Sequence, residues 1–190
     1  MIVAVDTSVL VLMINPDARP PLDPGTSAPL SRVADRINLF LSSFAAGDTL
    51  LVPTPVLAEL LVLAGDQGPG LFASLQTLAK VKLAAFDERA AIEIAMMTRE
   101  AKAAGDKRSG SEQPWQKVKF DRQIIAIARV HGAARILADD AGLLSFAKLL
   151  AMDTLSSWEL ALPPSTEDLF THAGLDEPSN PVGDFGTHEK

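Results

Sequence analysis

Residues 2–8 read IVAVDTS: four apolar residues are followed at once by a carboxylate and two hydroxyl side chains. A short apolar run is typical of a buried strand, and Asp, Thr and Ser are residues that commonly begin helices. Similar strands are expected at Thr49–Val52, Val81–Phe86, Ala134–Ala138 and Met152–Leu155, with helices at Val9–Ile14, Ser31–Ala46, Thr54–Ala64, Gly70–Lys80, Asp87–Ala104, Phe120–His131 and Asp140–Leu150. Strands that alternate with helices and are apolar throughout predict a parallel sheet with helices on both faces. We therefore expect an α/β fold, a three-layer α/β/α sandwich with a short, mostly parallel sheet.

Acidic residues interrupt the apolar segments of this pattern. Asp6 is the only charge in residues 2–14, and Glu59 is the only charge in residues 50–64. Asp121 begins an apolar helix, and Asp139 and Asp140 directly follow an apolar strand. Carboxylates are costly to bury unless they are paired, protonated or bound to a cation. Together these positions predict a site for a divalent metal ion.

Each acid also has a simpler explanation when it is taken alone. Asp6, Asp139 and Asp140 can cap the helices that follow them, and Asp121 is favoured in a first helical turn by the helix dipole. Glu59 has apolar neighbours on nearly every side of its helix, so we expect it to be buried. Its simplest alternative is an ion pair with an Arg or Lys from elsewhere. The metal hypothesis therefore depends on the whole set of acids.

The remaining composition restricts the type of metal. The chain has no cysteine and only three histidines, which are scattered along the sequence. Thiolate and histidine clusters are therefore excluded. Carboxylate oxygens prefer hard cations, so Mg²⁺ or Mn²⁺ is expected.

Basic residues gather in and beside the polar loop expected at residues 105–117. The net charge of the chain is −7, but many acids lie after Glu167, so this total argues only weakly against a nucleic-acid partner. Trp115 can stack on an unpaired base, and the alternative is a solvated loop with scattered charges. The candidate RNA-binding residues are Lys107, Arg108, Trp115, Lys117, Lys119 and Arg122.

Four motifs in this order resemble the PIN-domain family, and the VapC-like toxins within it. They are the strand followed by Asp-Thr-Ser at residue 6, PVLAELL around Glu59, FDRQIIAIA from residue 120, and ILADD ending at Asp140. The resemblance covers residues 2–162. It implies a Mg²⁺- or Mn²⁺-dependent endoribonuclease that hydrolyses RNA phosphodiester bonds, as the toxin of a type II toxin–antitoxin pair.

The resemblance also implies roles for single residues. Asp6, Glu59, Asp121 and Asp140 are expected to be catalytic and to bind metal, with Asp139 as a second choice beside Asp140, and Ser8 is expected to orient Asp6. The threonine usual in the last motif is Ala138 here. The expected partners are an RNA substrate, a cognate antitoxin protein and a second copy of the chain, the dimer forming through the helices near Glu59 and Gly70–Lys80.

Several departures keep other functions open. The loop at 15–29, the loop at 105–117 and an acidic segment at 163–190, expected to be a flexible tail beyond a 1–162 nuclease domain, are all longer than in compact toxins of this type. A catalytically weak or inactive interaction domain on the same scaffold is one alternative, and a housekeeping RNA or DNA nuclease without an antitoxin is another. A phosphotransferase of the haloacid-dehalogenase type would need an Asp at position 8, which is Ser8. No export signal is seen in the apolar N-terminal run, so we expect a cytoplasmic protein without a membrane segment.

Overall fold

The structure is a computed structural model that describes residues 1–15 and 17–164. Its strands are β1 (Ile2–Val5), β2 (Thr49–Pro53), β3 (Val81–Ala84), β4 (Arg135–Leu137) and β5 (Asp153–Leu155). Its helices are α1 (Thr7–Ile14), α2 (Val33–Ser42), α3 (Thr54–Ala64), α4 (Gly68–Thr77), α5 (Glu88–Ala103), α6 (Trp115–Val130) and α7 (Ala141–Leu149), with short 3₁₀ helices η1 (Gly65–Gln67) and η2 (Ser157–Glu159). The predicted tail at 163–190 lies almost entirely outside the described residues.

The five strands form one parallel sheet in the order β3-β2-β1-β4-β5. Ala4 in β1 is in register with Leu51 in β2 and with Ile136 in β4. The chain builds the sheet outward from β1 in one direction and then returns to build it in the other. The order of the strands therefore reverses between β1 and β4, which is where open α/β sheets form their sites.

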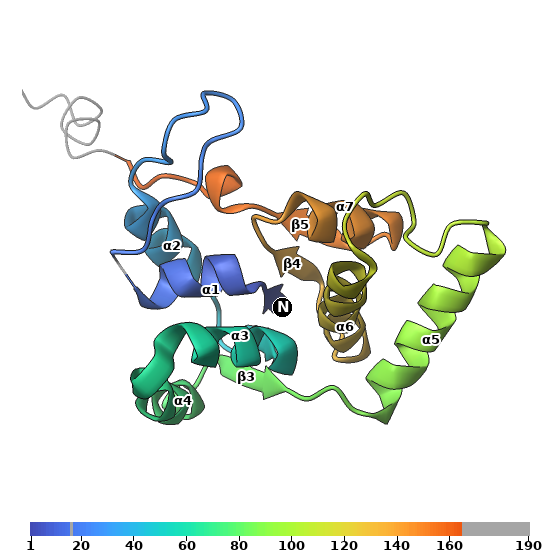
Figure 1. The fold of residues 1–190 in the computed structure, drawn as a ribbon. Helices are drawn as coiled ribbons and strands as arrows, with labels where there is room; N and C mark the ends of the chain where they lie inside the picture. Colours follow the sequence, from blue (N-terminus) through green and yellow to red (C-terminus); the bar gives the residue numbers. More distant parts are fainter. Residues whose placement is uncertain (16, 165–190) are drawn as a thin grey trace, which may run out of the picture.

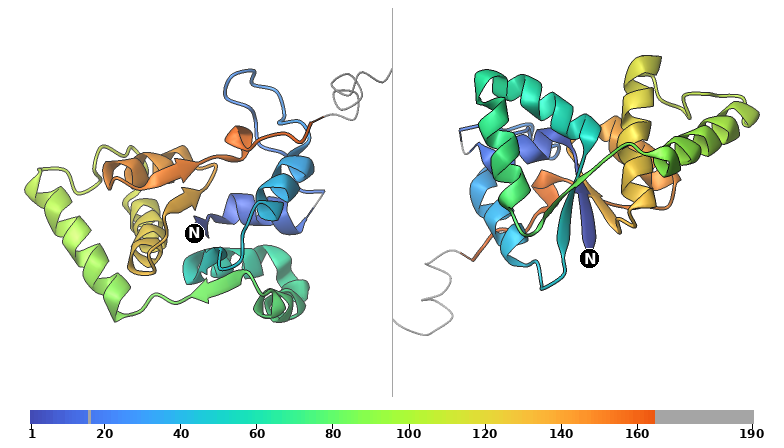
Figure 2. Two further views of the ribbon diagram at one scale, coloured as in Figure 1. Left: turned by 180° about the vertical axis from the view of Figure 1, so that it is seen from behind. Right: turned by 90° about the horizontal axis from the view of Figure 1, so that it is seen from below.

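Helices cover both faces of this sheet (Figures 1 and 2). Helices α1 to α4 lie on one side, and α5 to α7 lie on the other, as the view from below in Figure 2 shows. Right-handed crossovers explain this division, because the chain passes from β1 to β3 in one direction across the sheet and from β3 to β4 in the opposite one. The predicted α/β fold with a sheet between two helical layers is confirmed.

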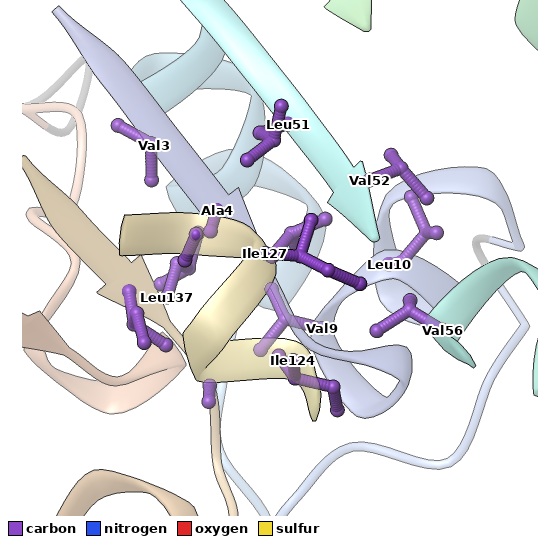
Figure 3. Close-up of a cluster of buried hydrophobic side chains, with 14 of the residues drawn as sticks. Val3, Ala4, Val9, Leu10, Leu51, Val52, Val56, Ile124, Ile127 and Leu137 are labelled. Atoms are coloured by element: carbon purple, nitrogen blue, oxygen red, sulfur yellow. The ribbon is translucent and has the colours of Figure 1, made fainter. Parts of the chain in front are cut away.

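The core surrounds the central strands, which pack against α1 and α3 as well as against α6 (Figure 3). Val3, Leu51 and Leu137 from three neighbouring strands are fully buried, and so is Ile127 of α6. In the segment 124–128 of α6 every residue is buried, because the sheet, α3, α5 and α7 surround this helix. Asp121 is also buried and lies one helical turn before this segment, so the packing of α6 in the core fixes its position.

Helix α6 starts earlier than the sequence predicts. It begins at Trp115, directly after Pro114, whereas the sequence analysis placed its start at Phe120 and a loop up to Lys117. The first turn carries no apolar periodicity, which is why the helical pattern becomes visible only later. Trp115 and Lys117 therefore belong to α6, and the helix sets the directions in which their side chains point.

Residues 54–77 form a stretch long and apolar enough, by length and composition alone, to cross a membrane. The stretch is not one straight helix. Gly65 has φ +51°, which turns the chain into η1, and α3 and α4 pack against each other as a hairpin. The outer side of α3 is apolar and exposed, with Val62 81% and Leu63 69% exposed.

Candidate active site

Asp6 lies at the point where the strand order reverses. Its backbone N–H donates to the carbonyl of Leu137 at 3.0 Å, which joins the ends of β1 and β4. The side chain is buried and does not cap α1. Instead, the Ser8 hydroxyl donates to Asp6 Oδ2 at 2.9 Å, the contact expected from the sequence. This hydrogen bond fixes the orientation of the Asp6 carboxylate, which lines the pocket described below.

The two acids after β4 have different surroundings. Both oxygens of Asp139 accept hydrogen bonds from Ser157, one from its backbone N–H and one from its hydroxyl, each at 2.8 Å. Asp140 caps α7 by accepting from the Leu143 N–H at 2.8 Å, and its other oxygen lies 2.9 Å from Lys117 Nζ. Asp139 thus anchors η2, whereas Asp140 is joined to Asp121 through the ammonium of Lys117.

Lys117 lies between two of the predicted metal ligands. Its ammonium is 3.2 Å from Asp121 Oδ1, one helical turn away, and 2.9 Å from Asp140 Oδ2. The sequence predicts that Lys117 binds RNA, but the earlier start of α6 places it inside the acidic group. A cation therefore already bridges α6 and the end of β4 in this structure.

Glu59 is exposed, so the prediction that it is buried is wrong. The apolar residues around it on α3 do not all face the core, because the outer side of this helix is itself apolar. Thr7, which is not among the residues predicted from the sequence, donates from Oγ1 to Glu59 Oε2. This hydrogen bond ties Glu59 to the start of α1, beside Asp6. In the sequence, the feature that could have indicated this contact is the position of Thr7 directly after Asp6, at the end of a strand.

These side chains line one open pocket of about 400 Å³. The polar lining consists of Asp6, Thr7, Ser8, Glu59, Lys117, Asp121, Asp139 and Asp140. Among the described residues, no group of three or more His, Asp or Glu lies close enough together to hold a metal ion. The donor set nevertheless fits a hard divalent cation, because every donor is a carboxylate oxygen and the ammonium of Lys117 already stands between two of them.

Burial and crowding change the acidity of this pocket. Burial raises the pKa of Asp121 to about 6, opposed by Lys117 and assisted by the charges of Asp140 and Asp6. Burial likewise raises the pKa of Asp6, and the charges of Asp140 and Glu59 add to that rise. For Asp140 burial acts in the same direction, but hydrogen bonds from the Leu143 N–H and from Lys117 lower its pKa overall. The charge of one carboxylate therefore shifts the pKa of another, as is common where acids gather at a functional site.

Several of the remaining candidate RNA-binding residues lie together around Trp115: Lys107 Nζ is 5.2 Å from the centroid of its ring, and Trp115, Lys119 and Arg122 line one cavity. Lys107, Arg108 and Lys119 are exposed and Trp115 is partly buried. Arg122 is only 1% exposed, so its predicted contact with RNA is not supported by its position. Its guanidinium lies 5.4 Å from the centroid of the Trp115 ring, and it donates to Thr98 Oγ1, the Lys107 carbonyl and Ser109 Oγ. Arg122 therefore holds the loop between α5 and α6.

Comparisons with known proteins identify the fold. No protein-family profile matches the chain, and no curated protein sequence matches it. Among solved structures, VapBC2 from Rickettsia felis bound to a promoter DNA fragment has a chain 16% identical, with a TM-score of 0.51 over 82% of this chain and 98% of that chain. VapBC-1 from nontypeable Haemophilus influenzae is 15% identical, with a TM-score of 0.52 over 83% and 98%. The DNA-bound VapBC of Salmonella typhimurium is 15% identical, with a TM-score of 0.50 over 83% and 98%.

The fold and the pocket define an α/β/α protein with a cluster of carboxylates at the switch point of its sheet. Its fold is that of the VapC-like PIN domain, as these structural likenesses show. The likeness spans nearly the full length of the similar chains, so the whole scaffold is shared.

Proposed function

We propose that this protein is a metal-dependent endoribonuclease, acting as the toxin of a type II toxin–antitoxin pair. The observation that carries the proposal is the convergence of Asp6, Glu59, Asp121 and Asp140 on one pocket at the β1/β4 switch point. The VapC-like fold supports the same function, because the similar solved structures are VapBC complexes. Mg²⁺ or Mn²⁺ is the proposed cofactor, and a cytoplasmic location is proposed with it.

In this proposal the residues of the pocket have different roles. Asp6, Asp121 and Asp140 hold the cation, with Asp6 oriented by Ser8. Glu59, held by Thr7 at the exposed edge of the pocket, positions the attacking water beside the phosphodiester. When bound, the divalent ion supplies an activated water and neutralises the charge that develops on the phosphate. We leave Asp139 out of the proposed ligand set, because its two hydrogen bonds with Ser157 tie it to η2.

Lys117 acts as the counter-cation of the metal-free site. Two carboxylates that face each other in a partly buried pocket repel, and the ammonium between Asp121 and Asp140 offsets that repulsion. Asp121 and Asp140 would hold a divalent ion in place of this ammonium, and Lys117 would then be available to bind a phosphate oxygen of the substrate.

The proposal is tested by incubating the purified protein with a mixed pool of RNA and single-stranded DNA, with Mg²⁺, with Mn²⁺ and with EDTA. We expect RNA to be cut only with metal, and Asp6→Asn to abolish cutting. Asp66→Asn is the matched control, because Asp66 is an exposed acid on η1, outside the pocket. Cutting of DNA in place of RNA would favour a nuclease of the housekeeping type.

A non-catalytic interaction domain is the second candidate. The observation that favours it is the arrangement of the acids, which form no metal group among the described residues while Lys117 bridges two of them. Metal binding without any cutting of the pool would support this alternative. Cutting that disappears in Asp6→Asn but persists in Asp66→Asn would contradict it.

The proposed antitoxin blocks the acidic pocket with a basic side chain. Lys117 shows that a side-chain cation is accommodated between Asp121 and Asp140. An arginine on a partner helix would make the same contacts, with two N–H groups directed at the carboxylates. We also propose that the exposed apolar side of the α3–α4 hairpin forms the homodimer interface, because Val62 and Leu63 are large, apolar and exposed there.

A further inference from the structure

A second cavity, of about 440 Å³, lies between α5 and α6. The α6 residues that line it include Trp115, Lys119 and Arg122, whereas Lys117 and Asp121 line the acidic pocket. With 3.6 residues per turn, these two sets point to opposite sides of α6. The cavity is therefore separate from the acidic pocket but only one helix diameter away, a distance of about 10–12 Å. Figure 1 shows α5 and α6, the two helices that carry most of the residues lining it.

The rim of the cavity carries unneutralised positive charge. Arg99, Lys102 and Lys119 line it and are exposed. Within residues 1–15 and 17–164 none of the three forms an ion pair or a side-chain hydrogen bond, and no residue that lines the cavity is acidic. This charge is complementary to phosphate groups.

The interior of the cavity is apolar and partly aromatic. Phe86, 41% exposed, and the indole of Trp115 both border it, and Ala95 leaves open space along α5. Two cations lie over the Trp115 ring and hold it in place: Lys107 Nζ is 5.2 Å from its centroid, and the buried guanidinium of Arg122 is 5.4 Å from it. A fixed aromatic ring inside a cationic rim suits a flat aromatic ligand that carries negative charges beside it, as a nucleotide does.

We propose that this cavity binds an unpaired nucleobase of single-stranded RNA, while Arg99, Lys102 and Lys119 bind the flanking phosphates. The proposal rests on the proposed nuclease function and specifies its substrate as a strand unpaired near the cut. The RNA passes from the acidic pocket over the first turn of α6 to reach the cavity. A base inside a duplex is stacked on both faces and cannot enter, so duplex RNA gains nothing from the cavity.

The binding test uses a fluorescein-labelled single-stranded RNA dodecamer of adenosines, with its duplex as a second probe. All proteins carry Asp6→Asn so that the probe stays intact. Ala95→Phe fills the cavity without changing charge, and Ala91→Phe places the same ring at an exposed position of α5 outside it. We expect Ala95→Phe to weaken single-strand binding about tenfold, the effect of losing one stacked base, and Ala91→Phe to leave it unchanged. Duplex binding should be the same in both variants.

The rim is tested through the salt dependence of the same binding. Lys102→Gln with Lys119→Gln should lower the slope of log K against log salt by about 0.7 for each phosphate that the variant no longer binds. Lys148→Gln, an exposed lysine on α7, is the control and should leave the slope unchanged. Circular dichroism melting of each variant separates a loss of binding from a loss of folding.

A direct readout comes from the two tryptophans of the chain. Trp158→Phe leaves Trp115 as the sole indole, and its fluorescence should be quenched by the single strand with Ala91→Phe but not with Ala95→Phe. Equal affinity, equal salt slope and equal quenching in the cavity variants and their controls would overturn the proposal. A protein partner would then be the remaining candidate ligand of the cavity. Cleavage by the parent protein is measured separately, so a failure of the nuclease function is distinguished from a failure of this site.

Discussion

Lys117 shows how much the meaning of one residue depends on the helix that carries it. In sequence it is one of several basic residues before Asp121, and an RNA contact is a natural interpretation. Since α6 begins at Trp115, Lys117 is four residues before Asp121 on a continuous helix, where oppositely charged side chains meet. Its second contact, with Asp140, depends on the sheet topology and has no local signal in the sequence.

Replacing Lys117 with Met should strengthen metal binding and weaken the metal-free fold. Two partly exposed ion pairs contribute about 0.2–1 kcal/mol each, so the affinity for Mn²⁺ should rise by about two- to thirtyfold. Titration calorimetry measures the affinity, and thermal melting in EDTA should show a lower Tm. Lys119→Met is the control, because this exposed lysine forms no ion pair within the described residues. Identical Mn²⁺ affinities for the two variants would refute the counter-cation role.

The acidity of Asp121 gives a second prediction. The pKa of Asp121 is about 6 in the folded state and 3.8 in the unfolded state, so the folded state binds the proton more tightly. This proton contributes its full stabilisation below pH 3.8, and the stabilisation is lost as the pH rises through 6. In EDTA, the free energy of unfolding of the parent should therefore fall relative to that of Asp121→Asn between pH 4 and 7. Mn²⁺ affinity should change in the opposite direction, because metal binding requires the ionised acid. Chemical denaturation at each pH measures the first effect, and a parent curve parallel to that of Asp121→Asn would contradict it.

At the scale of elements, the sequence predicts most strands and helices but not which side of a helix faces solvent. All five strands are found where short apolar runs predict them. The error at Glu59 arises on α3, where Val62 and Leu63 are apolar yet exposed. Apolar residues on an unpaired surface look the same in sequence as those in a core, so burial of Glu59 could not be inferred from its neighbours.

The loop between α5 and α6 depends on one buried cation. Arg122 donates to Thr98 Oγ1, the Lys107 carbonyl and Ser109 Oγ at 3.0, 2.7 and 3.1 Å. Arg122→Met should lower the free energy of unfolding by about 1–3 kcal/mol, because it leaves these partners without their donor. Amide hydrogen exchange in residues 105–114 should also become faster. Arg99→Met, at an exposed position of α5, should change neither, and unchanged exchange in Arg122→Met would show that the loop is held by other contacts.

At the scale of the whole molecule, the topology explains why distant acids meet. Asp6 and Asp140 are far apart in sequence but follow β1 and β4, which are neighbours in the sheet. Strand ends of a parallel sheet share one edge, so the alternation of strands and helices already predicts a common edge for these acids. The strand order itself is a long-range property that the sequence does not predict, and it is seen only in the structure.

The two faces of α3 give the last prediction. One side of α3 packs on the core, and the other presents Val62 and Leu63 to solvent, an arrangement that single-chain packing does not require. If a second copy covers this side, the 20.2-kDa chain should elute as a dimer in size exclusion with light scattering at tens of micromolar. Leu63→Glu should convert it to a monomer, because the dimer would bury an unpaired carboxylate. Leu149→Glu alters a similarly exposed leucine on α7, 65% exposed, and should remain a dimer. A parent protein that is monomeric under these conditions would leave the apolar side of α3 to the antitoxin.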